Sequence, residues 1–149
     1  MAKYSIKTDP EKTARAYGYE LHCSPKDSVN IAYALRGMKT DEAKKYLEDV
    51  IALKRALPAV YHKQKVHHQR GRVGPGSFPK KAASYILKIL ENAENNAEYK
   101  GFDPENMKIV HISAYRGRTI HAIMPRAHGS ATDANENTTS IEIILEEAE

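Results

Sequence analysis

The stretch RGRTIHAIMPRAHGSATDANENTTSIEIIL, residues 116–145, contains two strand-like segments joined by an unusually long connection. A β-hairpin turns within about two to five residues, whereas small and polar residues fill the space from Met124 to Ser140. Two sides of about 12 residues, at about 3.3 Å per residue, would carry the tip roughly 30–40 Å beyond the core. A flexible surface loop is the alternative, but it would not need β-branched residues such as Ile120. The stretch therefore predicts an extended β-hairpin arm over about residues 115–140.

The strands at the base of this arm have the alternation of a sheet with one buried face. MKIVHISAY, residues 107–115, is rich in β-branched side chains. In the returning segment TTSIEIILEE, residues 138–147, acids alternate with apolar residues. We expect the buried face to carry Val110, Ile112, Ala114, Ile141, Ile143 and Leu145, and water to reach Glu142 and Glu146.

Three helices precede these strands, and each has signals at its ends. Ser24 and Thr40 are expected N-caps, and Pro25 suits a first helical position. The helices are predicted to run from Ser24 to Gly37, from Thr40 to Pro58 and from Pro79 to Gly101. Apolar residues at helical spacing predict a buried stripe on the last two: Ala43, Tyr46, Leu47, Val50 and Ile51, then Ala83, Ile86, Leu87, Leu90 and Ala97.

Residues 58–79 lose this periodicity and form a basic loop rich in glycine and proline. A structureless segment of about 20 residues is uncommon in a small domain unless it has a function. Rings interleave with the cations here, and rings can stack on unpaired bases. A solvated loop without a partner is the alternative. The candidate phosphate-binding residues in and just after the loop are Lys63, Lys65, Arg70, Arg72, Lys80 and Lys81.

The predicted order is helix, helix, basic loop, helix and strand pair. This order indicates an α+β fold in which three helices pack on a small antiparallel sheet. At 149 residues the chain has room for one domain of ordinary size. We therefore expect residues 1–149 to form a single domain.

Charge is strongly segregated along the chain, although the net charge is only +4. Residues 50–90 contain nine Lys or Arg and no acid, and residues 106–132 contain four and no acid. The last 17 residues contain six acids and no Lys or Arg. Acid-free basic blocks favour a polyanionic partner, because each cation that meets a phosphate releases counterions.

Other features place the chain in the cytoplasm and argue against membrane insertion and enzymatic chemistry. No apolar run approaches the 18 residues of a membrane span, and the N-terminus lacks the apolar middle of a signal peptide. The single cysteine, Cys23, fits a reducing compartment. The seven His residues show no metal-ligand spacing, and no phosphate-binding loop or catalytic constellation is present. We expect no catalytic residue, metal, cofactor or small-molecule substrate.

Five segments, in this order, resemble the archaeal form of the large-subunit ribosomal protein twenty-two family, whose eukaryotic counterpart is numbered seventeen. They are KKYLEDVIALKRALP (44–58), FPKKAASYILKILENAENNAEYKG (78–101), MKIVHISAYRGRTI (107–120), MPRAHGSA (124–131) and IEIILEE (141–147). The resemblance extends from about Tyr4 to Glu147. The helix start PKKAA, the helix end LENAENNAE and the PRAHG segment are its most specific parts.

The resemblance implies a structural protein that binds large-subunit rRNA, supports subunit assembly and contacts neighbouring ribosomal proteins. It also implies a hairpin whose tip lines the polypeptide exit tunnel and meets the nascent polypeptide. Carried over to this chain, Arg116, Arg118, Arg126 and His128 match the basic hairpin positions, and Lys80 and Lys81 match the helix-start lysines. The expected tip is Ser130, Ala131, Thr132, Asp133, Ala134, Asn135, Glu136 and Asn137.

The expected tip departs from the family pattern, which usually continues after the glycine with Arg and an aromatic or apolar residue. Here Ser130 follows Gly129, and Asp133 and Glu136 bring negative charge. Acids repel phosphate, so we expect this tip to face an open lumen or a neighbouring protein rather than rRNA. Two other functions stay open at this point. One is a free-standing RNA-binding or RNA-chaperone module, and the other is an enzyme acting on nucleic acid.

Overall fold

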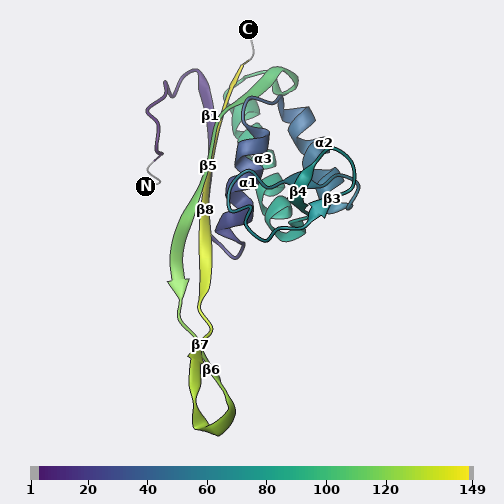
Figure 1. Ribbon diagram of the computed structural model, residues 1–149. Helices are drawn as coiled ribbons and strands as arrows, with labels where there is room; N and C mark the ends of the chain where they lie inside the picture. The colour runs from purple at the N-terminus through teal and green to yellow at the C-terminus, as the bar shows by residue number, and fades with distance from the viewer. Residues whose placement is uncertain (1–3, 148–149) are drawn as a thin grey trace.

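The computed structural model describes residues 4–147, apart from the side chain of Glu105 (Figure 1). The first half contains β1 (Thr13–Leu21), α1 (Pro25–Leu35), α2 (Thr40–Ile51), β2 (Leu57–Pro58), β3 (His68–Gln69) and β4 (Gly74–Ser77). The second half contains α3 (Lys80–Tyr99), η1 (Pro104–Asn106), β5 (Met107–Ile120), β6 (Ile123–Pro125), η2 (Ala127–Gly129), β7 (Ala131–Asp133) and β8 (Glu136–Glu147).

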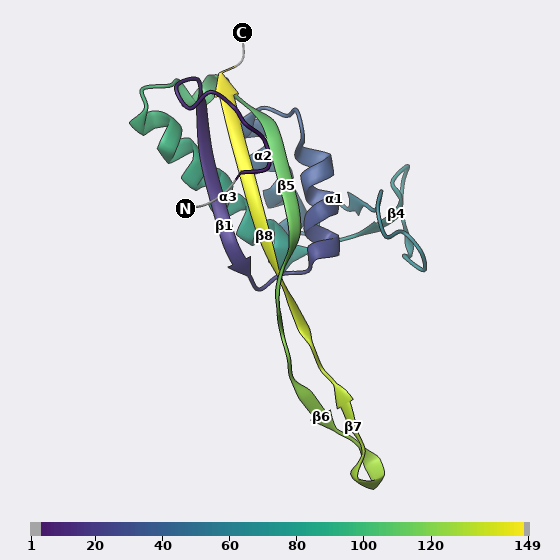
Figure 2. The ribbon, with the colours of Figure 1, turned by 90° about the vertical axis from the view of Figure 1, so that its left-hand side faces the viewer.

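The main sheet has the order β1-β8-β5, and both strand pairs are antiparallel. Helices α1 and α3 cover one face of this sheet, and α2 packs on α3 (Figures 1 and 2). Between the layers lie buried aliphatic side chains from the three helices and from the strands of the main sheet, among them Ile31, Leu47, Ile86, Ile112 and Ile143. The expected α+β class, with three helices on an antiparallel sheet and a long hairpin arm, is confirmed.

Strand β1 is the strand of the main sheet that the sequence pattern missed. Its residues on the helix side are Ala14, Ala16 and Gly18, which are too small to produce a visible apolar alternation. Their size is set by α3, which lies directly against β1. A Cβ atom on Gly18 would lie 2.5 Å from Ile89 Cδ1. Close packing of a helix on a strand therefore removed the signal by which strands are recognised in sequence.

The sheet face that the helices leave free is covered in part by the N-terminal segment, which crosses it in Figure 2. Glu142 projects to this face and is fully buried, so the expectation that water reaches it is wrong. The backbone N of Ser5 donates to Glu142 Oε2 at 3.0 Å, and the Ser5 hydroxyl donates to Oε1. His111 Nε2 lies 2.9 Å from Oε1. Strand β8 is the central strand, so β1 and β5 shield it on both sides. The N-terminal segment also covers the Glu142 carboxylate on the face that the helices leave free.

The predicted face of β5 is wrong at one residue, Val110, which is 44% exposed. The pairing register shifts between Ile109 and His111, so the strand contains a β-bulge at this point. A bulge inserts one residue and reverses the alternation beyond it. Met107 and Ile109 therefore share the buried face with Ile112, and Val110 turns outward.

The ends of α1 agree with the sequence signals. Ser24 Oγ accepts from Asp27 N, Pro25 begins the helix, and Gly37 follows it with φ +81°. At the end of α3, Gly101 has φ +83°, as expected for a residue just beyond a helix.

Helix α2 differs from its prediction at both ends. Its N-cap is Lys39, and the buried Thr40 donates its hydroxyl to Pro104 O and Met107 O instead. The helix ends at Ile51 rather than near Pro58, because Leu53 adopts φ +62° and turns the chain. Leu57 can then pair with Ser77 in a separate strand and reach the core.

Candidate nucleic-acid interface

The basic loop is folded, although its sequence has no periodicity. Strands β2, β4 and β3 form a small antiparallel sheet inside it. Gly76 lies where strands β2 and β4 are closest, and a Cβ atom there would lie 2.8 Å from Leu57 O. Gln69 Nε2 donates to Gly76 O at 3.0 Å, and Ala59 N donates to Pro75 O at 2.8 Å. These contacts hold the loop in a defined shape without a hydrophobic core of its own.

All six cations assigned to this region are exposed. Lys63 and Lys65 lie between β2 and β3, and Arg70 and Arg72 lie in the turn between β3 and β4. Lys80 and Lys81 open α3, directly after the loop. Their charges oppose the positive end of the helix dipole, an arrangement that is unfavourable for the helix but attractive to an anion.

The arm projects away from the helices as a long two-stranded ribbon (Figure 1). Pairing of β5 with β8 continues outward to Ile120 and Glu136, and β6 pairs with β7 from Ile123 and Asp133 onward. Between these two ladders Ala134 N donates to Ala122 O at 2.7 Å. The hairpin closes over residues 126–130, where Arg126 N donates to Ser130 O at 2.8 Å.

This turn lies closer to the outgoing strand than the sequence predicted. Only Ser130 of the expected tip, residues 130–137, belongs to the turn. Ala131, Thr132 and Asp133 form β7, Ala134 and Asn135 join the two ladders, and Glu136 and Asn137 begin β8. The physical reason is local: His128 and Gly129 adopt φ +58° and +72°, which turns the chain over residues 126–130, whereas the resemblance placed the tip at residues 130–137. The end of the arm is therefore basic, and its acids lie along the return.

Gly117 permits a second bulge at the root of the arm, between Arg116 and Thr119. A Cβ atom on this residue would lie 2.7 Å from Thr138 Oγ1. Thr138 Oγ1 itself donates to Arg118 O at 2.7 Å. The bulge increases the local twist of the ribbon where it leaves the sheet.

The four basic arm residues are also exposed: Arg116, Arg118, Arg126 and His128. Arg116 Nη2 donates to Thr119 Oγ1 at 2.8 Å, and Arg126 Nε donates to Thr132 Oγ1 at 3.1 Å. These bonds orient the guanidinium groups and leave their other N–H donors free. Within residues 4–147, the ion pairs Lys44–Glu94 and His111–Glu142 involve none of the ten basic candidates.

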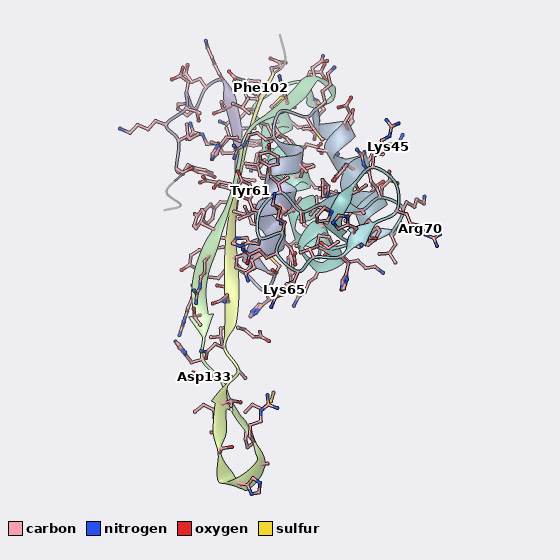
Figure 3. The ribbon with its side chains drawn as sticks, in the orientation of Figure 1. Lys45, Tyr61, Lys65, Arg70, Phe102 and Asp133 are labelled. Atoms are coloured by element: carbon pink, nitrogen blue, oxygen red, sulfur yellow. The ribbon has the colours of Figure 1, made fainter. Side chains whose placement is uncertain are left out.

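The ten candidates form two groups rather than one patch. The loop residues and the start of α3 lie on the helix side, and the arm residues follow the ribbon (Figure 3). Any single partner that meets both groups must be large and must wrap around the domain.

Several aromatic residues near the arm were missed because β1 was missed. Tyr17 and Tyr19 of β1 stack with a ring separation of 6.4 Å, and Tyr17 Oη lies 2.6 Å from Tyr115 Oη. Tyr19 is 70% exposed. Burial, and then the hydrogen bond to Tyr17, raise the pKa of the Tyr115 hydroxyl. Exposed tyrosine rings at the root of a basic arm are suited to stacking on bases.

Other kinds of site find little support in the part of the chain that is described. No three His, Cys, Asp or Glu side chains gather there as a metal ion would need. Nor does that part contain a helix that is both long and apolar enough to cross a membrane.

The family description "ribosomal protein L22p/L17e" matches residues 16–146, a range that includes the basic loop and the whole arm. The chain belongs to this ribosomal protein family. Among the relatives of this L22p/L17e chain are proteins named large ribosomal subunit protein uL22. The protein from Methanococcoides burtonii is 47% identical over 97% of this chain and 96% of its own length.

Two more proteins with that name give the same result. The protein from Archaeoglobus fulgidus is 49% identical over 96% of this L22p/L17e chain and 94% of its own length. The protein from Methanocaldococcus jannaschii is also 49% identical, over 97% and 94%. The resemblance read from the five sequence segments is thus confirmed.

Proposed function

We propose that this chain is a structural constituent of the large ribosomal subunit that binds large-subunit rRNA and acts without catalysis in the cytoplasm. Membership of the L22p/L17e family carries the assignment to the ribosome. Ten exposed basic side chains, none of them in an ion pair within residues 4–147, support rRNA as the partner. Phosphate contacts of this kind position a protein on RNA, and the shape of the RNA selects the binding site.

The arm is the part whose order depends most on assembly. Residues 120–133 are exposed throughout, and β6 pairs with β7 at only three positions. An isolated two-stranded ribbon is marginally stable in water. Surrounding RNA and neighbouring ribosomal proteins would replace the core that the arm lacks, so we place it inside the subunit.

Co-sedimentation tests the ribosomal assignment. The protein should remain with large subunits that have been washed in high salt, because an integrated arm cannot dissociate like a surface ligand. Its release with the wash, together with binding to unrelated RNAs, would indicate a free-standing RNA-binding or RNA-chaperone module instead.

Salt dependence tests the phosphate contacts. Arg116→Ala, Arg118→Ala and Arg126→Ala should each weaken binding to deproteinised large-subunit rRNA and reduce the slope of log K against log salt by about 0.7–0.9. Lys12→Ala is the control, since this exposed lysine precedes β1 at the end of the sheet far from the arm. Unchanged slopes in all three arginine variants would show that the basic side of the arm does not meet phosphate.

The tip is proposed to line the polypeptide exit tunnel, and the residues that reach farthest are 126–130. A photoreactive amino acid in place of His128 should crosslink to the nascent polypeptide in translating ribosomes. The same group in place of Asn137, which pairs with Thr119 nearer the body, should not. Crosslinks from position 128 to rRNA alone would remove the nascent polypeptide as a partner.

A further inference from the structure

A small pocket lies between α1, the basic loop and the edge of the sheet. It has a volume of about 130 Å³. It is lined by Tyr33 of α1, Arg36 directly after this helix, Tyr61 of the loop and residues 112–114 of β5. Pockets that enclose a whole drug-sized ligand have about 300–1,000 Å³, so this one suits a single small planar ring. It is too small for a whole nucleotide.

The two tyrosine rings form the aromatic wall of this pocket. Their centroids are 5.6 Å apart, and their planes meet at 87°, so one ring presents its edge to the other. Tyr33 is 49% exposed and Tyr61 is 48% exposed. In this geometry each ring keeps a face on which a second planar group can stack.

The position of Tyr61 is fixed in advance by Asn30, whose side chain is only 6% exposed. Asn30 Oδ1 accepts from Tyr61 N at 2.8 Å and from Val60 N at 3.1 Å. Asn30 Nδ2 donates to Tyr61 O at 3.1 Å. His62 then adopts φ +56°, which turns the chain immediately after the ring. The backbone that carries the Tyr61 ring is thus already ordered, which lowers the conformational entropy lost when a ligand binds.

The polar groups of the pocket match the edge of a base. Strand β5 lies at the edge of the sheet, where backbone N–H and C=O groups lack a strand partner. Arg36 Nη2 donates to Ile112 O at 3.3 Å, which holds the guanidinium at this edge with other donors free. No acidic side chain lines the pocket.

The pocket also lies where the two groups of cations approach each other. Lys63 and Lys65 follow Tyr61 in the loop, and Arg116 follows the pocket residue Ala114 at the root of the arm. All three cations are exposed. A base in the pocket would therefore place the phosphates on its two sides near positive charge.

We propose that this pocket receives one unpaired base of the bound RNA, stacked on the ring of Tyr61, in contact with the ring of Tyr33, and hydrogen-bonded by Arg36 and the edge of β5. The inference rests on rRNA binding as the proposed function and names the single-stranded feature that the protein recognises. Sequence-specific RNA recognition generally uses unstacked bases of this kind.

The test compares ring-preserving and ring-removing variants in binding to deproteinised large-subunit rRNA. Tyr61→Leu and, separately, Tyr33→Leu should weaken binding about 5- to 150-fold, the effect of losing one base–aromatic stack. Tyr61→Phe and Tyr33→Phe should bind like wild type. The slope of log K against log salt should stay unchanged in all four tyrosine variants, whereas Lys63→Ala should reduce this slope. Both tyrosines are half exposed, and circular dichroism with the unfolding midpoint would verify that each variant is folded.

Chemical probing with dimethyl sulfate locates the base. One unpaired adenine or cytosine should be protected by wild type and by the Phe variants, and should become reactive again with Tyr61→Leu. Wild-type binding together with unchanged affinity and protection in both Leu variants would overturn the pocket and leave the proposed function standing. Absence of binding by wild type itself would overturn the proposed function and the pocket with it. If the Leu variants keep their affinity for rRNA but lose a contact to a neighbouring ribosomal protein, the pocket receives a protein side chain and the proposal is overturned.

Discussion

Glu142 is the residue where burial, charge and the N-terminal segment meet. Burial would raise the pKa of this carboxyl, but hydrogen bonds from Ser5 and His111 outweigh it and hold the pKa below its usual value of 4.5. A group with a lowered pKa in the folded state stabilises the protein above the unfolded-state pKa, and this stabilisation is lost as the pH falls through the folded-state pKa. The N-terminal segment is thus attached to the sheet by a carboxylate that must stay ionised.

Replacing this carboxylate should change both the stability and its pH dependence. Glu142→Gln should lower the free energy of unfolding by about 1–3 kcal/mol at neutral pH, because bonds to a charged acceptor become bonds to an amide. Below about pH 4.5, wild type should lose stability more steeply than this variant. Urea unfolding at several pH values measures both effects. Ser5→Ala removes one donor only and should give a smaller change in the same direction. If the stabilities of wild type and Glu142→Gln change with pH in parallel, the ionised Glu142 carboxylate does not stabilise the folded state.

Gly76 decides whether the basic loop can fold as a small sheet. A methyl group there would meet Leu57 O at 2.8 Å, a backbone atom that cannot move aside like a side chain. Gly76→Ala should therefore lower the free energy of unfolding by about 1–3 kcal/mol, the usual cost of overpacking. Ser77→Ala, one residue further along the same strand, should stay within about 0.5 kcal/mol of wild type. Equal unfolding midpoints for the two variants would show that the loop adjusts freely.

The two candidate RNA-binding elements differ in how they are held. The loop is anchored to α1 through Asn30 and to itself through β2, β4 and β3. The outer arm is held by hydrogen bonds between its own two sides, with every residue from 120 to 133 exposed. Local stability follows buried contacts, so the arm should open far more often than the loop in the free protein.

Amide hydrogen exchange measures this difference. In the free protein, amides of β6 and β7 should exchange fast, while those of β1 and of β8 inside the main sheet should be protected. Binding to rRNA should slow exchange in β6 and β7 and leave unchanged the exchange of residues 141–145 of β8, the central strand of the main sheet. Protection of β6 and β7 in the free protein equal to that of β1 would mean that the arm is stable without a partner.

The ten candidate RNA-binding residues lie in two separate regions of the molecule, the loop side and the arm. Such a distribution suits a partner that surrounds the protein rather than one that binds a single face. It also explains why the net charge of +4 is a poor guide to function, since the acids lie outside the basic loop and outside the turn at residues 126–130.

Independent contacts by the two regions predict additive effects on binding. The losses in binding free energy for Lys65→Ala and Arg126→Ala should add within about 0.5 kcal/mol in the double variant, because distant sites without shared partners do not couple. Filter binding of the four proteins to large-subunit rRNA at one salt concentration measures the cycle. A coupling energy above about 1 kcal/mol would indicate that loop and arm act on the same RNA element.

Local sequence determined the parts of this protein that depend on neighbours in the chain. The caps at Ser24 and Gly101, the apolar stripes of α2 and α3 and the excess length of the arm all act over a few residues, and the structure agrees with them. The basic loop and the outgoing half of the arm were likewise visible as acid-free stretches.

Tertiary contacts decided the rest, because the responsible partners are distant in sequence. Strand β1 owes its small residues to α3, and Glu142 is buried by a segment more than 130 residues away. Simple alternation predicts Val110 in the core, but the bulge at this residue turns its side chain outward. The positive φ angles of His128 and Leu53 set where the arm turns and where α2 ends, and both points come earlier in the chain than the sequence predicted. The pocket between Tyr33 and Tyr61 exists only after Asn30 has drawn the loop onto α1, so no pattern in the sequence could have shown it.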